Sequence, residues 1–218
     1  MSISEKIQTL KNTLPKELTL VAVSKTKPVN EILEAYNTGH RIFGENKIQE
    51  LVSKQTEMPK DIEWHMIGHV QRNKVKYIAS FVVLIHAVDS LKLLKEINKQ
   101  ALKNNRIINC LIQIKIASEE SKFGLSQEDS LSLLLSEDIK ELKNISIQGL
   151  MGMATFTSNV SQVEKEFQSL NEFYNNTRKD FNFKTLSMGM SGDYNLAISC
   201  GSNMIRVGSA IFGERNYS

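Results

Sequence analysis

Eight short apolar segments recur along this sequence, each followed by a stretch with helical periodicity, and this alternation limits the possible folds more than any other feature. The segments that predict buried strands are 19–24, 41–45, 62–68, 84–88, 107–116, 145–153, 186–190 and 204–208. The predicted helices are 3–14, 29–38, 46–54, 73–80, 91–103, a segment from 126 on, 160–178 and 194–200. Strands that alternate with helices form parallel sheets. Eight such units without a linker predict a single α/β domain over residues 1–218, a (β/α)8 TIM barrel with an extra N-terminal helix.

A doubly wound open sheet is the alternative arrangement of the same elements. That fold commonly binds dinucleotides through a G-x-G-x-x-G segment directly after its first strand. Here the first strand runs into Ser24-Lys25-Thr26-Lys27-Pro28, which contains no glycine. The sequence therefore favours the barrel.

The composition argues against several classes of protein. The 27 Lys and Arg residues exceed the 24 Asp and Glu residues by only three and are spread along the chain, which argues against a nucleic-acid or membrane-surface partner. The N-terminal MSISEKIQTLKNTL is charged where a signal peptide is apolar, and no stretch approaches the roughly 20 apolar residues of a membrane span. Cys110 and Cys200 lie in apolar surroundings, as buried thiols of a reducing compartment do, so we expect a cytoplasmic protein. No Cys/His spacing predicts a metal site, and no G-x-S-x-G turn predicts a serine hydrolase.

The first strand delivers a lysine to its carboxyl end. Four apolar residues, 20–23, run into Ser24 and Lys25, and Pro28 then suits the first turn of a helix. At such a corner an amine lies partly out of water, which makes its neutral, nucleophilic form accessible, and the charge of Lys27 adds to this effect. Taken alone, however, the segment favours an ordinary solvated loop lysine, since most lysines are exposed to solvent.

In TIM barrels the chemistry collects where the carboxyl ends of the strands meet. Besides Lys25, the residues expected there are Glu45, Asn46, His69, Met153, Ser191, Gly192, Gly208 and Ser209. The last two loops of a barrel often bind phosphate. Both loops offer a hydroxyl and backbone N–H groups beside glycine, although these glycines also serve simple tight turns.

Arg206 lies inside an apolar strand pattern, where a guanidinium needs a partner. That partner is either a structural carboxylate such as Glu45 or an acceptor on a bound ligand. An amine, a phosphate cradle and an arginine at one barrel mouth suggest pyridoxal 5′-phosphate (PLP) held as a Schiff base. A phosphosugar aldehyde, as in a Schiff-base aldolase, satisfies the first two features.

Two of the four histidines lie within strand patterns. His65 and His86 are expected to be hydrogen-bonded core or rim residues more than catalysts. His69 follows the third strand and is placed to approach a ligand ring, whereas His40 belongs to a helix end.

Several segments together resemble the pyridoxal phosphate homeostasis protein family, also called YggS/PROSC. The matching segments are 22–28 (AVSKTKP), 43–46 (FGEN), 64–69 (WHMIGH), 86–90 (HAVDS), 149–151 (GLM), 186–193 (LSMGMSGD) and 205–213 (IRVGSAIFG). The resemblance covers almost the full chain and implies a barrel like the N-terminal domain of alanine racemase.

The resemblance also implies roles for individual residues. PLP is expected on Lys25, with Ser191 and the pair Gly208 and Ser209 at its phosphate, Arg206 at the pyridine nitrogen and Asn46 near the Schiff-base side of the ring. Ser209 stands where many relatives carry threonine, a change that keeps the hydroxyl.

The resemblance implies a protein that binds and keeps PLP more than one that uses it for catalysis. An arginine at the pyridine nitrogen keeps the ring neutral and a poor electron sink. Alanine racemase adds a second base from a further domain, and this sequence ends directly after its eighth unit. We therefore expect a monomeric, non-catalytic protein that stores, buffers or delivers PLP, with apoenzymes as recipients and Lys27, Lys74, His69 or the loop 118–124 assisting transfer. A minimal PLP-dependent amino-acid racemase or lyase is the alternative.

Overall fold

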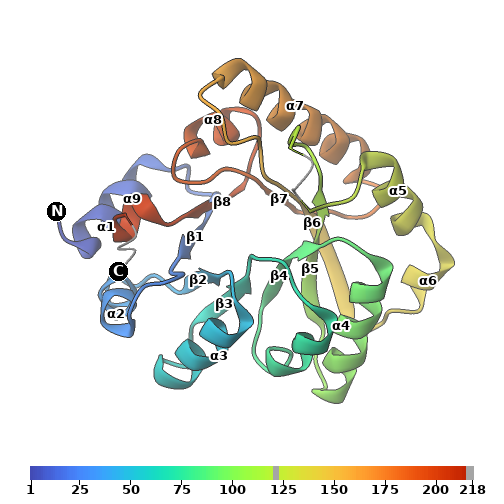
Figure 1. The fold of residues 1–218 in the computed structure, drawn as a ribbon, viewed down its shortest axis with the longest axis horizontal. Coiled ribbons are helices and arrows are strands. Elements are labelled where there is room, and N and C mark those ends of the chain that lie inside the picture. Colours follow the sequence, from blue (N-terminus) through green and yellow to red (C-terminus); the bar gives the residue numbers. More distant parts are fainter. Residues whose placement is uncertain (120–122, 215–218) are drawn as a thin grey trace.

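Each of the eight predicted segments contains a strand, and each strand pairs in parallel with the next (Figure 1). The computed structural model describes residues 1–119 and 123–214. The strands are β1 (Thr19–Val23), β2 (Ile42–Glu45), β3 (Glu63–Met66), β4 (Leu84–Val88), β5 (Ile108–Ile114), β6 (Ile145–Gly152), β7 (Thr185–Ser187) and β8 (Met204–Val207). β8 pairs with β1, Leu20 opposite Ile205 and Val21 opposite Arg206, which closes the barrel. The predicted (β/α)8 barrel is thereby confirmed, and the open-sheet alternative is wrong.

Helices surround the barrel (Figure 1). They are α1 (Ile3–Thr13), α2 (Val29–Asn37), α3 (Ile48–Glu57), η1 (Arg72–Tyr77), α4 (Leu91–Lys103), α5 (Gln127–Leu135), α6 (Glu137–Lys140), α7 (Val160–Thr177), α8 (Tyr194–Ser199) and α9 (Ser209–Phe212). The predicted N-terminal helix is α1, which begins with a capping box between Ser2 and Glu5 and packs against α2 and α9. None of the helices in the described ranges is both long enough and apolar enough to cross a membrane.

Two helices differ from the prediction. A helix was predicted over 73–80, and the structure has the 3₁₀ helix η1 there, which ends earlier, at Tyr77. Val75 is the one buried residue of η1, so this segment lacks the apolar face that would stabilise a longer helix. The short helix α6 was not predicted, and none of its residues is buried.

Side chains of the strands alternate between the barrel interior and the layer under the helices. The interior cluster consists of Val21, Leu84, Ala87, Leu111, Met151 and Met204. Ala22, Phe43 and Ile85 belong to the larger cluster between strands and helices. Because successive residues of β1 point to opposite faces, Val23 and Lys25 follow Val21 inward, and Ser24 faces the helices. This alternation decides which strand-end residues enter the barrel mouth.

Candidate functional site

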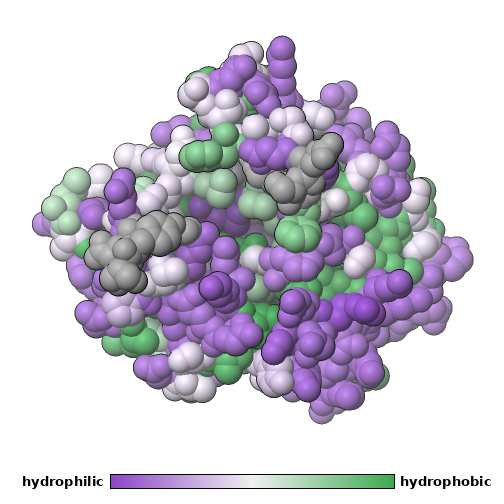
Figure 2. Space-filling view, viewed as in Figure 1, coloured by the Kyte–Doolittle hydropathy of each residue, from purple (hydrophilic) through white to green (hydrophobic). Residues whose placement is uncertain are grey.

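A cavity of about 540 Å³ opens at the carboxyl ends of the strands. Figure 2 views the molecule onto this face, which is hollowed near its centre where hydrophilic and hydrophobic residues meet. All six residues predicted to bind the cofactor line the cavity: Lys25, Asn46, Ser191, Arg206, Gly208 and Ser209. Residues far apart in the sequence are thus brought to one place by the order of the strands.

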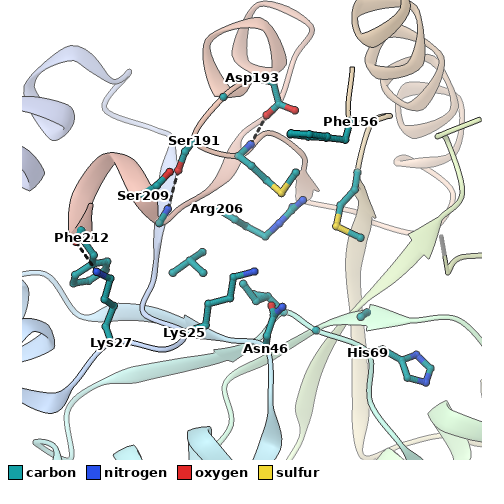
Figure 3. A pocket seen from close by; sticks show the side chains of 18 of the residues that line it. Lys25, Lys27, Asn46, His69, Phe156, Ser191, Asp193, Arg206, Ser209 and Phe212 are labelled. Carbon is teal, nitrogen blue, oxygen red and sulfur yellow. Dashed lines mark hydrogen bonds between the residues drawn. The ribbon is translucent and has the colours of Figure 1, made fainter. Parts of the chain in front are cut away.

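Lys25 and Arg206 approach the cavity from neighbouring strands. Arg206 lies on β8 opposite Val21 of β1, and Lys25 follows β1 at the corner before α2. Their side chains point into the same space, with Asn46 beside Lys25 (Figure 3).

Arg206 is held by neutral acceptors. Its Nη1 donates to Ser187 Oγ at 2.6 Å and its Nη2 donates to the carbonyl of Gly152 at 3.0 Å. The residue is 4% exposed, and this burial lowers its pKa to about 10, which leaves the guanidinium charged at neutral pH. Glu45, one of the two expected partners, faces the opposite side of the strand and contacts Lys54 instead. The expectation that Glu45 would lie at the mouth is therefore wrong, because the strand alternation directs it outward.

Behind Arg206 a buried hydrogen-bond chain crosses the barrel. Ser187 Oγ lies 3.3 Å from His86 Nδ1, and His86 Nε2 lies 3.1 Å from His65 Nδ1. An arginine can only donate, so Ser187 Oγ accepts from Arg206, while the tautomers of the two histidines set which atom donates in the other two contacts. Both histidines are neutral, because burial lowers the pKa of His65 to about 3 and that of His86 well below its usual value. The prediction that they are hydrogen-bonded core residues is confirmed.

The loops after β7 and β8 meet at Ser191. Its Oγ accepts hydrogen bonds from the backbone N–H groups of Gly208, at 3.1 Å, and Ala210, at 3.5 Å. Asp193 shapes this loop by accepting from the backbone N–H of Met190 at 2.5 Å. Gly189 has a φ of +95°, and a Cβ there would lie 2.6 Å from Ala197 Cβ, so the loop requires glycine. Two N–H groups converge on one oxygen here, the arrangement that suits an oxygen of a phosphate.

Asn46 lies between β2 and α3 and not inside the helix that was predicted to start there, since α3 begins at Ile48. Gly68 packs directly against its backbone. A Cβ at position 68 would lie 2.3 Å from the Asn46 carbonyl oxygen. This close approach fixes the position of Asn46 at the cavity wall.

The wall formed by β3 to β6 carries residues that the sequence did not single out. Gln113 on β5 is buried and donates to the carbonyl of Phe123 at 2.9 Å. The Phe123 ring stacks on His69 with 4.3 Å between centroids, and Phe156, which is 96% exposed, stands at the rim. Gln113 could have been found from the sequence, because it is a polar residue at an inward-facing position of an apolar strand. The aromatic residues gave no periodic signal because they lie in loops.

His69 and Lys27 line the cavity but are engaged elsewhere. His69 Nδ1 lies 3.4 Å from Asp89 Oδ2, and its ring lies apart from Lys25 in Figure 3. Lys27 Nζ donates to the carbonyl of Phe212 at 2.8 Å and lies 3.4 Å from Glu31 Oε2. Of the loop 118–124, residues 120–122 lie outside the described part of the chain. Within the described ranges, no group of three His, Cys, Asp or Glu side chains is arranged to hold a metal ion.

Sequence comparison places the chain among known proteins. Residues 1–216 match the family model "Alanine racemase, N-terminal domain". A pyridoxal phosphate homeostasis protein of Aquifex aeolicus is 40% identical over 201 residues, which cover 91% of this chain and 87% of that protein. The protein of the same name from Haemophilus influenzae is 39% identical over 225 residues, covering 99% of this chain and 94% of the relative.

Comparison with solved structures agrees with the sequence comparison. PipY of Synechococcus elongatus PCC7942, solved with PLP bound, has a TM-score of 0.88 and 32% identity, with 97% of this chain and 100% of that chain covered. Alanine racemase of Clostridium difficile 630 shares the fold, with a TM-score of 0.79 at 14% identity, over 100% of this chain and 58% of that chain. The chain belongs to the family of pyridoxal phosphate homeostasis proteins.

Proposed function

We propose that this protein binds PLP as a Schiff base on Lys25 and stores, buffers or delivers it within the cell without turning over a substrate. The observation that carries the proposal is the convergence of Lys25, Arg206 and the Ser191–Gly208 contact in one cavity. The relative PipY has been solved with PLP bound, and relatives of about 40% identity are named for PLP homeostasis.

The residues of the cavity fit PLP in three ways. The backbone N–H groups of Gly208 and Ala210 donate to Ser191 Oγ, and a phosphate oxygen that took the place of this hydroxyl would accept the same two hydrogen bonds. The Ser209 hydroxyl lies on the same wall. The Lys25 amine would form a C=N bond with the aldehyde carbon and release the aldehyde oxygen as water. Arg206 would donate towards the pyridine nitrogen, with its plane fixed by Ser187 and Gly152.

Arg206 also supports the non-catalytic part of the proposal. PLP, when bound, supplies an aldehyde and an electron-withdrawing ring. A buried guanidinium with a pKa of about 10 keeps its proton at neutral pH, so it donates a hydrogen bond without protonating the ring. A neutral pyridine withdraws electrons weakly, which disfavours bond cleavage at the Cα of an amino acid.

We propose further that the protein acts as a monomer in the cytoplasm and passes PLP to apoenzymes. Cys110 and Cys200 are both free and buried, which suits a reducing compartment. Storage or delivery requires that binding be reversible, and Schiff-base formation with an amine is reversible by hydrolysis.

The experiment mixes the purified protein with PLP and follows the absorption spectrum, first alone and then with a panel of amino acids in deuterium oxide. We expect a bound-PLP band, no deuterium at the amino-acid Cα, and reactivation of an apoenzyme by the loaded protein while a scavenger removes free PLP. Exchange at Cα would favour an amino-acid racemase or lyase. Adducts with phosphosugars but none with PLP would favour an aldolase.

A further inference from the structure

The corner that carries Lys25 is held from behind by a buried ionic cluster. The cluster consists of Ser24, Glu45, Glu50 and Lys54, contributed by the end of β1, by β2 and by α3. Lys54 Nζ donates to Glu45 Oε1 at 2.8 Å and to Glu50 Oε1 at 2.6 Å. Ser24 Oγ donates to Glu45 Oε1 at 2.5 Å. None of these side chains enters the cavity, so the cluster has no direct contact with a ligand there.

Two contacts of this cluster reach the backbone on either side of Lys25. Before it, the carbonyl of Ser24 accepts from Lys54 Nζ at 2.8 Å. After it, the backbone N–H of Thr26 donates to Glu50 Oε1 at 2.6 Å. The N–H of Lys27 donates to the Ser24 carbonyl at 3.0 Å and completes the turn. The chain is therefore anchored at both neighbours of Lys25.

Thr26 adopts a conformation that its side chain disfavours. Its φ is +65°, in the left-handed region where β-branched residues are outliers. Such strain persists only where the surroundings hold it, and strained residues cluster at functional sites. The carboxylate of Glu50 accepts from the N–H of this residue, so it is the contact that holds Thr26 itself within the strained turn.

Burying the charged groups of this cluster also costs free energy. The Lys54 side chain is 7% exposed and the Glu45 side chain is fully buried. Glu45 Oε2 has no hydrogen-bond partner among the described residues, and burial raises the pKa of this carboxyl despite the Lys54 charge. Buried ion pairs contribute little net stability and can instead specify one conformation.

From these contacts we infer that Glu50 and Lys54 are positioning residues for Lys25, which fix the turn 24–27 so that the Lys25 amine enters the cavity. The inference rests on the proposed function, since it concerns the lysine proposed to bind PLP. Glu50 is the better residue to test, because its side chain is 23% exposed and its loss leaves Lys54 paired with Glu45.

The test measures the rate of PLP adduct formation by stopped-flow absorbance and the amount of adduct after borohydride reduction. Glu50→Ala is expected to slow the reaction by about tenfold, the effect of one lost charge-assisted hydrogen bond. Glu50→Gln keeps an acceptor for the Thr26 N–H and should stay within about threefold of the wild-type rate. Glu57→Ala, on the exposed end of the same helix, is the matched control and should react as the wild type does.

A double-mutant cycle separates positioning from general destabilisation. Glycine adopts a positive φ without strain, so in a Thr26→Gly background the effect of Glu50→Ala should shrink to less than about threefold. Thermal unfolding of each variant identifies any that fails to fold. Wild-type rates in Glu50→Ala, or an equal loss with and without Thr26→Gly, would overturn the inference. If the wild-type protein itself formed no adduct, the proposed function would fail, and the inference with it.

Discussion

Ser187 Oγ accepts a hydrogen bond from Arg206 Nη1 at 2.6 Å, and this contact connects the arginine of the cavity to two buried histidines. Ser187 is fully buried, and its oxygen also lies 3.3 Å from His86 Nδ1. One hydroxyl therefore accepts from a charged group and also contacts a neutral ring. Because arginine cannot accept, the direction of the first contact is fixed, and the tautomers of His86 and His65 set the direction of the other two.

Ser187→Ala should reduce both stability and PLP affinity. The substitution leaves an N–H of Arg206 and the Nδ1 of His86 without this partner inside the barrel, at a cost of about 1–3 kcal/mol for a buried unsatisfied group. Urea unfolding and PLP titration measure the two effects. Ser199→Ala is the control, because Ser199 is exposed, its hydroxyl donates to the Leu196 carbonyl of the same helix, and it does not belong to the residues that line the cavity. Unchanged unfolding in Ser187→Ala would contradict the assigned chain.

The buried histidines should make the protein sensitive to mild acid. Burial, followed by the nearby charge of Lys11, lowers the pKa of His40 from 6.5 to about 4. As the pH falls below 6.5, the unfolded chain binds a proton that the folded chain does not bind until about pH 4, so stability falls over this interval. For His40 alone the loss between pH 7 and pH 5 is about 2 kcal/mol. His65 and His86 act in the same direction.

Urea unfolding at pH 7, 6 and 5 measures this dependence. His40→Gln keeps a donor for the Ile42 carbonyl, which His40 Nε2 contacts at 2.8 Å, and removes one titrating group. The slope of stability against pH should then decrease by up to about 1.4 kcal/mol per pH unit. An unchanged slope would show that His40 does not titrate in the predicted way.

Gly68→Ala should displace Asn46 and weaken PLP binding. The added methyl group would lie 2.3 Å from the Asn46 carbonyl oxygen, so the backbone there must move. We expect a loss of about 1–3 kcal/mol in stability, as for other overpacked sites, together with lower PLP affinity. Thermal unfolding and PLP titration test both. Gly192→Ala is the control for stability, because a Cβ at 192 meets no atom within 4 Å; equal destabilisation by the two changes would argue against the close contact.

Lys27→Ala should show that Lys27 has a structural role and that Lys25 is the reactive lysine. Lys27 Nζ binds the carbonyl of Phe212 at the end of α9, so its loss should lower stability by about 1 kcal/mol. Adduct formation on Lys25 should persist, as measured by mass spectrometry after borohydride reduction. Complete loss of the adduct with an intact fold would give Lys27 a direct part in PLP binding.

The strand order and the cavity could be predicted because most of the strands lie in apolar runs and several of their carboxyl ends carry polar residues, among them Lys25, Asn46 and Ser191. Lys25 and Arg206 lie on segments distant in sequence, and the barrel topology alone predicts that they meet. The positions of Ser191 and Ser209 at the cavity were predicted because the last two loops of a barrel often bind phosphate.

Other features depend on details that a sequence pattern does not contain. The outward direction of Glu45 follows from the alternation in β2, which a four-residue strand leaves ambiguous. The roles of Ser187 and Lys54 depend on partners 19 and 9 positions away in the chain, brought close only by folding. The 3₁₀ geometry of η1 reflects how few of its residues pack, which the charge-rich sequence did not reveal.

The location of the bound cofactor tests the account most directly. The protein is incubated with PLP, reduced with borohydride, digested and analysed by mass spectrometry of the peptides. The account predicts one phosphopyridoxyl group on Lys25 and none in an equally folded Lys25→Ala variant. An adduct on another lysine, or equal labelling of the two proteins, would contradict it.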